Sequence, residues 1–404
     1  MIEIKKRKFT QKQMQKKIKI LHVISSVNPI HGGPAESIRQ LYKHCKKSNL
    51  YQEIMCMDKP NSPWLKDKSL PKIHAVGPAY LKYAFNFTIK HWLKKNLVNY
   101  DMIILNGLWQ YPSLVAANTA VNLKIPYWVF CHGMLDPWFQ KTYFFKKIKK
   151  TIYWKLFQHK ILKKAQAVFF TTEQEKILAK NQFLPYRIKE ELFPYGISGP
   201  AKKNSFSKNP LLKKYPELKN KKIILFLGRI AEKKGCDILI KAFSKIRNSD
   251  SSWHLLIVGF SNKYSENLKK TCNQLNISAR VTWIPGLFGD DKWNAYYLAN
   301  VFCLPSHQEN FGISVIESIS AGIPVIISNK VNTFIEIKKY NAGFICNDNV
   351  NSFLTSLKKW IKISDNKRKQ ISNNGKELFK ERFHAKQSAK YLKASFINFI
   401  KNKR

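Results

Sequence analysis

Acidic residues are scarce in this chain. It has 25 Asp and Glu against 71 Lys and Arg, a formal net charge of +46. Such a field attracts polyanions, which include nucleic acid, anionic lipid and anionic sugar intermediates. A coding bias toward Lys, Asn and Ile explains part of this charge, and we assign the other part to a membrane surface. No segment matches a zinc finger, a helix-turn-helix or an RNP motif, so nucleic acid is not expected as a partner.

Long apolar runs are also missing. None reaches the roughly 20 residues that a membrane-spanning helix needs. The N-terminal segment lacks the apolar core of a signal peptide, so we predict a cytoplasmic protein. The seven cysteines are scattered and match no metal-site spacing, which predicts buried, reduced thiols. A hydrophobic content of 44% over 404 residues predicts a globular protein with room for two domains.

A strand–loop–helix–strand unit is predicted from residue 301 to residue 328. Val301–Leu304 is typical of a buried strand, and Ser314 is placed to cap the helix that follows the loop. Ligands of open α/β sheets bind at the carboxyl ends of the strands. The loop and the helix bring two carboxylates, Glu309 and Glu317, to this place beside a helix N-terminus, which favours anions.

A nucleotide sugar offers hydroxyls for the carboxylates and phosphates for the helix end. By spacing alone, an ordinary helix with an acidic N-terminus explains the two glutamates equally well. The segment PSHQENFGISVIESISAGIPVI, however, resembles the E-x7-E signature of retaining glycosyltransferase family 4, the group 1 glycosyl transferases with the GT-B fold. The resemblance implies that Glu309 is catalytic beside the donor sugar, that Glu317 binds the ribose, and that Asn310, Phe311 and Gly312 contact the donor. Asn310 replaces the usual glycine, which predicts a reshaped sugar pocket.

Two cations follow the predicted strand Ile223–Leu227. Arg229, a planar fork, and Lys234, a point charge, suit a diphosphate. In so basic a chain two cations in a loop mean little by themselves. The segment GRIAEKKG resembles the donor-phosphate motif G-R-x-x-x-x-K-G of the same family at every fixed position. The resemblance further implies that the loop 285–288, with Leu287, lies against the nucleotide base.

Two further candidate sites lie in the first half of the chain. Gly32 and Gly33 follow a predicted strand and let the backbone approach a ligand, although they form no G-x-G-x-x-G fingerprint. The segment HGGPAESIRQL resembles the first loop of the family, which implies phosphate or acceptor contacts. His132 follows the predicted strand Tyr127–Phe130; a lone histidine is more often structural, but HGMLDPW resembles the segment with the family's active-site histidine. We therefore predict that His132 positions the substrate.

The alternation of strands and helices predicts an α/β chain. The resemblance implies two Rossmann-like doubly wound domains that face each other across a cleft, the GT-B arrangement. We predict these segments: a basic tail over residues 1–17, an acceptor-binding domain over 18–197, a linker over 198–220, a nucleotide-sugar domain over 221–380, and a helix over 381–404 that crosses back to the first domain.

The predicted reaction is transfer of a sugar, with retained configuration, from a UDP-, GDP- or ADP-sugar to an acceptor hydroxyl. The cations and the helix end stabilise the leaving group, so we expect neither a metal nor another cofactor. The expected acceptor is a lipid-linked or polysaccharide intermediate of surface polysaccharide, lipopolysaccharide or exopolysaccharide synthesis.

A second region, residues 138–164, combines aromatic residues with lysines. Phe145, Ile148, Ile152 and Leu156 fall on one helical face, which suits an anionic membrane surface at the inner face of the plasma membrane. Two other functions stay open: a nucleotide-sugar epimerase of similar fold, and a basic protein that binds nucleic acid or membranes without catalysis.

Overall fold

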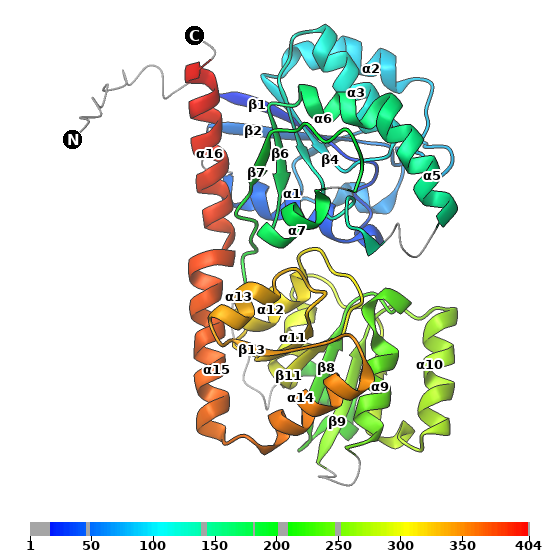
Figure 1. The fold of residues 1–404 in the computed structure, drawn as a ribbon, viewed down its shortest axis with the longest axis vertical. Coiled ribbons are helices and arrows are strands. Elements are labelled where there is room, and N and C mark those ends of the chain that lie inside the picture. Colours follow the sequence, from blue (N-terminus) through cyan, green and yellow to red (C-terminus); the bar gives the residue numbers. More distant parts are fainter. Residues whose placement is uncertain are drawn as a thin grey trace, which may run out of the picture. The chain divides into compact units, whose positions relative to one another are not determined.

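The structure, a computed structural model, describes residues 17–402 except 46–48, 139–143, 181, 201–208 and 247–251. The predicted basic tail, residue 17 apart, lies outside the described residues. The chain divides into two compact units: Met1–Phe193 with Ser388–Arg404, and Pro194–Gln387. Each unit consists of a parallel β-sheet with helices packed against it (Figure 1).

The first unit contains a seven-stranded sheet in the order β3-β2-β1-β4-β5-β6-β7. All its strand pairs are parallel. The chain builds outward from β1 to β3 and then returns to the other side of β1 with β4, so the strand order reverses between β1 and β4. The strands are β1 (Ile18–Val23), β2 (Leu50–Cys56), β3 (Lys72–Ala75), β4 (Met102–Asn106), β5 (Tyr127–Phe130), β6 (Ala167–Phe170) and β7 (Glu190–Leu192).

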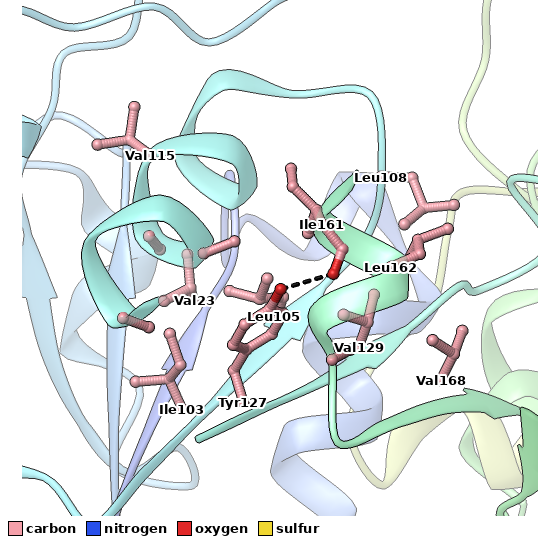
Figure 2. Close-up of a cluster of buried hydrophobic side chains, with 14 of the residues drawn as sticks. Val23, Ile103, Leu105, Leu108, Val115, Tyr127, Val129, Ile161, Leu162 and Val168 are labelled. Carbon is pink, nitrogen blue, oxygen red and sulfur yellow. Dashed lines mark hydrogen bonds between the residues drawn. The ribbon is translucent and has the colours of Figure 1, made fainter. Parts of the chain in front are cut away.

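Apolar side chains cover both faces of this sheet, as a parallel sheet between helices requires. On one face, the residues of Figure 2 join the strands to α3 and α6, and Tyr127 donates a hydrogen bond of 2.5 Å to the carbonyl of Ile161. On the other face, the ring of Phe396 on α16 lies 4.4 Å from that of Trp128. The helices of this unit are α1 (Gly33–Cys45), α2 (Ile89–Asn96), α3 (Tyr111–Asn122), α5 (Phe144–Tyr153), α6 (His159–Lys164), α7 (Glu173–Ala179) and most of α16 (Ala385–Asn402).

The second unit repeats this plan with a six-stranded parallel sheet in the order β10-β9-β8-β11-β12-β13. Here the strand order reverses between β8 and β11. The strands are β8 (Lys222–Leu227), β9 (Trp253–Val258), β10 (Val281–Ile284), β11 (Ala299–Leu304), β12 (Val325–Ser328) and β13 (Gly343–Cys346). The helices are α8 (Pro210–Lys214), α9 (Cys236–Ser244), α10 (Lys263–Gln274), α11 (Asp291–Leu298), α12 (Ile313–Ser320), α13 (Phe334–Lys339), α14 (Val350–Lys362) and α15 (Asp365–Leu378).

The prediction of an α/β chain with two doubly wound sheets is confirmed. Residues 198–220, predicted as a linker, contain α8, and the amide of Asn209 donates a 2.8 Å hydrogen bond to the carbonyl of Asn294 on α11. The predicted cap Ser314 is wrong: the N-cap of α12 is Gly312, which adopts the left-handed conformation (φ +72°), so the helix begins at Ile313, two residues earlier than a Ser314 cap would place it. Among the described helices, none has the length and apolar character needed to cross a membrane.

Candidate active site

The candidate site of the second unit lies where its strand order reverses. Because β8 and β11 are parallel neighbours, the loops after them, 228–235 and 305–312, leave the sheet at the same edge. The loops touch: the backbone N–H of His307 donates a 2.8 Å hydrogen bond to the carbonyl of Lys233. Gly235 has φ +65°, and a Cβ there would lie 2.1 Å from the carbonyl oxygen of Pro305. Only glycine allows the loops to approach this closely.

Lys234 and Glu309 meet across these two loops. The Lys234 ammonium forms an ion pair with Oε2 of Glu309, and the two side chains are only 12% and 17% exposed. Burial lowers the pKa of Lys234 well below its usual range, and the positive charges of Lys233 and Arg229 act in the same direction. The Glu309 carboxylate beside the ammonium acts in the opposite direction, because a nearby negative charge favours the protonated form. Arg229 itself is exposed on the same loop, so the edge carries a concentrated positive charge beside one buried acid.

The backbone of Glu309 is fixed by the loop that follows β12. Its N–H donates to the carbonyl of Lys330, and its carbonyl accepts from the N–H of Asn332, both at 3.0 Å. These bonds hold the side chain of Glu309 at the edge of the sheet, where it meets Lys234. Lys330 and Asn332 were not predicted to lie near the site, because no motif includes them.

The second predicted acid, Glu317, lies on α12 and is 5% exposed. Lys292 on α11 forms an ion pair with one carboxylate oxygen, and the Tyr296 hydroxyl lies 2.9 Å from the other. Burial and the Glu317 carboxylate raise the pKa of Tyr296 well above its usual range, so its hydroxyl stays protonated and can donate. Lys292 and Tyr296 were not predicted, because one more lysine carries no signal in a chain with 71 cations.

Three other predicted donor contacts differ in what they can offer. The ring of Phe311 is buried, with Tyr195 at 4.5 Å and Phe383 at 5.5 Å, so only its backbone can face a ligand. Asn310, which stands between Glu309 and Phe311 in the sequence, is half-buried. Leu287 is half-buried in the loop after β10, at the same edge of the sheet as the loops after β8 and β11.

In the first unit, Gly32 and Gly33 lie between β1 and α1, at the edge where that sheet reverses its order. Gly32 has φ +80°, and no atom lies within 4 Å of the Cβ position, so the backbone is open here. Gly33 is the first residue of α1. The loop is braced by Asp58, whose carboxylate accepts hydrogen bonds from the Ser26 hydroxyl at 2.6 Å and the Val27 N–H at 2.8 Å.

His132 follows β5 at the same edge of the first sheet. Its Nε2 lies 3.5 Å from Oδ1 of Asn106, the last residue of β4, and its ring stacks on Phe130. Burial lowers the pKa of His132 to about 4, so the ring is neutral at neutral pH. Glu175, 4% exposed, fixes the loop: one carboxylate oxygen accepts the Gly133 N–H at 2.6 Å, and the other accepts the Thr171 N–H at 2.7 Å.

The predicted residues therefore form two groups. Arg229, Lys234, Glu309 and Glu317 lie with Leu287 along the carboxyl edge of the second sheet, and Gly32, Gly33 and His132 lie along that of the first. In the part of the chain that the structure describes, no three His, Cys, Asp or Glu side chains cluster as metal ligands would.

Comparison with curated proteins finds similarity to glycosyltransferases. The chain is 33% identical over 181 residues to an uncharacterized glycosyltransferase of Haemophilus influenzae. It is 26% identical over 195 residues to the capsular polysaccharide biosynthesis glycosyltransferase CapM of Staphylococcus aureus. These matches cover 44% and 48% of this chain, and 46% and 50% of the relatives' own length. The chain thus spans half or less of the curated relatives it matches.

Solved structures match over almost the whole chain. A glycosyltransferase from Rickettsia africae has a TM-score of 0.78 at 18% identity and covers 96% of this chain and 99% of its own. Anabaena HepE in complex with UDP and glucose has a TM-score of 0.77 at 15% identity, over 94% and 99%. At these identities the likeness shows the fold, which is GT-B.

The family follows from two matches that together cover most of the chain. Residues 32–196 match the glycosyl transferase 4-like domain, within the first unit apart from its last residues. Residues 207–378 match the family described as glycosyl transferases group 1, within the second unit. The chain therefore belongs to the group 1 glycosyltransferases, as its motifs predicted.

Proposed function

We propose that this enzyme transfers a sugar from a nucleotide diphospho-sugar to an acceptor hydroxyl and retains the configuration at the anomeric carbon. The contact between Lys234 and Glu309 is the observation that carries the proposal. It brings a largely buried cation and a largely buried acid from two loops to one point at the edge where the strand order reverses. In a diphospho-sugar, the anionic diphosphate and the sugar hydroxyls likewise lie close together.

Each charged group has a role in the proposed step. The bond between the anomeric carbon and the diphosphate oxygen breaks, the anomeric carbon bonds to the acceptor oxygen on the same face, and the acceptor proton is released. The departing nucleoside diphosphate gains negative charge, which Arg229 and Lys234 neutralise. Glu309 accepts hydrogen bonds from hydroxyls of the transferred sugar, and Glu317 accepts hydrogen bonds from those of the ribose.

The donor is proposed to carry uridine, guanosine or adenosine diphosphate, and HepE, which binds UDP, makes UDP-sugars the first to test. A thermal-shift screen of the three classes measures this directly. One class should raise the melting temperature by binding the native state, and Lys234→Ala should abolish that rise. Interconversion of free nucleotide sugars without an acceptor would instead identify an epimerase.

Metal independence is part of the proposal, because the two cations supply the charge that a metal would otherwise bring to the diphosphate. Turnover should therefore be unchanged in EDTA. Loss of turnover in EDTA that returns with Mg²⁺ or Mn²⁺ would contradict this part alone.

We further propose a lipid-linked or surface-polysaccharide acceptor and a peripheral membrane location. Between residues 72 and 172 the chain has fifteen lysines but only two acids, Asp101 and Asp136. The helical stretch from α5 onward exposes apolar side chains among these lysines; the side chain of Phe145 lies outside the described residues. The exposed residues are Ile148 (47%), Ile152 (55%), Leu156 (51%) and Phe157 (43%).

Vesicle flotation tests the membrane part of the proposal. The enzyme should float with vesicles that contain anionic lipid and stay in solution with neutral ones, because each lysine near the surface contributes about 1 kcal/mol. CapM, which acts in capsular polysaccharide biosynthesis, supports an acceptor of this class. Equal flotation with neutral vesicles, or none with anionic ones, would remove the membrane from the proposal.

A further inference from the structure

A groove lies on the first unit, apart from the residues discussed so far. It runs between α2 and α3 and has a volume of about 470 Å³. The surface of its lining is mostly apolar, although Asn118, Thr119 and Asn122 of α3 also line it, and two lysines lie on the side of α2. The lining residues that matter here are Tyr111, Leu114, Val115, Leu123, Lys90 and Lys94.

The groove starts at the edge of the sheet where the acceptor is expected. Helix α3 begins at Tyr111, five residues after the end of β4, which is one of the two strands at the reversal of the sheet order. From Tyr111 the groove follows α3 to Leu123, a distance of about 18 Å at 1.5 Å per residue. An extended hydrocarbon chain of about a dozen carbons has a similar length.

The lysines give the groove a charge that nothing nearby compensates. Lys90 and Lys94 are exposed and lie one turn apart on α2, where like charges repel each other. Neither forms an ion pair with a carboxylate in the described part of the chain, and α2 and α3 contain no acidic residue. A bound anion would relieve the repulsion.

Exposed apolar side chains continue the groove at its α2 end. The segment before α2 exposes Leu81 (88%) and Phe87 (78%). The ring of Phe87 lies 4.7 Å from that of Phe85, and Phe85 lies 4.7 Å from Tyr111 in the groove. Ring contacts therefore connect the exposed Phe87 to Tyr111 in the groove. Leaving such surface in water costs about 25 cal/mol per Å².

We propose that this groove binds a lipid phosphate, with its hydrocarbon chain along Leu114, Val115 and Leu123 and its phosphate on Lys90 and Lys94. Length, apolar lining and uncompensated positive charge all match this occupant. The inference rests on the proposed function, because such a lipid would present the acceptor hydroxyl at the carboxyl edge of the first sheet.

Dodecyl phosphate, used below its micelle concentration, tests the proposal by calorimetry. It contains both the chain and the anion, whereas inorganic phosphate contains only the anion and dodecyl maltoside only the chain. Dodecyl phosphate should bind at least tenfold more tightly than either control. Equal binding of inorganic phosphate would reduce the site to an anion site, and equal binding of the maltoside to a detergent site, and both results would overturn the proposal.

Two variants locate the binding. The double charge reversal Lys90→Glu/Lys94→Glu should weaken dodecyl phosphate binding at least tenfold. Leu123→Asp should weaken it several-fold, and because Leu123 is already 37% exposed this change should leave the fold intact. The matched control is Lys358→Glu/Lys362→Glu on α14, with the same spacing and charge change in the other unit. If the control weakens binding as much, the effect is general charge and the groove is not the site.

The same variants separate this inference from the proposed function. Stabilisation by nucleotide sugars depends on the second unit and should be unchanged in the groove variants. If nucleotide sugars bind but dodecyl phosphate does not, the groove proposal fails alone. If dodecyl phosphate binds in the groove but no nucleotide sugar binds, the lipid site stands and the proposed reaction fails.

Discussion

The two units share one architecture but equip the same edge of the sheet differently. In the second unit the edge carries ion pairs, Lys234 with Glu309 and Lys292 with Glu317. In the first unit it carries open glycine backbone and a histidine that burial keeps neutral. Two buried acids of the first unit, Asp58 and Glu175, accept hydrogen bonds from backbone N–H groups of its loops. The fold supplies a position, and the loops decide whether that position is ionic or neutral.

The two units also differ in their net charge. The first unit has 39 lysines and arginines against 11 acids, and the second has 32 against 14. The unit with the less ionic edge therefore has the more basic surface. This separation suits a division of labour in which the second unit binds an anionic donor in a built site and the first meets an anionic acceptor over a broad face.

The largest effect should come from Lys234. Lys234→Ala removes the buried cation at the proposed leaving group, and turnover should fall about 100- to 1000-fold. Lys233→Ala is the matched control, because Lys233 is its neighbour in sequence and its ammonium lies 3.4 Å from Oε1 of Gln308, whereas that of Lys234 pairs with Glu309. Steady-state kinetics with the identified donor measures both. Equal losses in the two variants would show that the edge works by general charge.

His132 should show the complementary pattern. His132→Asn keeps a polar side chain but changes its reach, and turnover should fall about tenfold to 100-fold because positioning is lost. Donor affinity should be unchanged, since the donor contacts are assigned to the other unit. Kinetics combined with donor thermal shifts gives both numbers. Weaker donor binding in this variant would contradict the division of labour.

Glu317 should affect binding more than turnover. In Glu317→Gln a neutral acceptor replaces a charged one, and the KM for the donor should rise about tenfold while kcat changes little. The matched control is Glu266→Gln, an exposed glutamate on α10 of the same unit. A fall in kcat without a rise in KM would assign Glu317 to the chemical step instead of the ribose.

The smallest effect should be common to both units. His22 in the first and His254 in the second are buried, and burial lowers the pKa of each to about 4. Between pH 6.5 and 4 the unfolded chain binds these protons and the folded chain does not, so stability is present above this window and is lost as the pH falls through it. Each histidine contributes roughly 3 kcal/mol at most. Melting temperatures at pH 7, 5.5 and 4 should fall for the wild type and fall less for His254→Asn.

Much of the fold could be predicted because the inner strands are apolar on both faces. The inner strand β5 was predicted to the residue, and the predicted strands Ile223–Leu227 and Val301–Leu304 lie within β8 and β11. The edge strands of the first sheet, β3 (KIHA) and β7 (EEL), were missed, because both are short and carry charged side chains, so neither leaves an apolar run to detect.

The site divided in the same way. Local sequence motifs predicted that Arg229, Lys234, Glu309 and Glu317 lie in the segments that follow two strands, and the sheet topology brings these segments together at one edge. The cation that meets Glu317 comes from α11, 25 residues earlier, and no local pattern encodes that contact. An apolar loop residue such as Phe311 was predicted to line the site, yet its ring packs into the core, since lining and core residues have the same composition.

Helix α16 affects the order in which this chain folds during synthesis. The ring of Phe396 and the Tyr391 hydroxyl, which donates to Glu191 at 2.9 Å, close one face of a sheet whose strands were all synthesised before residue 193. As the chain leaves the ribosome, that sheet must wait, with Trp128 uncovered, until the entire second unit has emerged. The half that is made first is thus completed last, and during that interval it presents an apolar surface that chaperones would recognise.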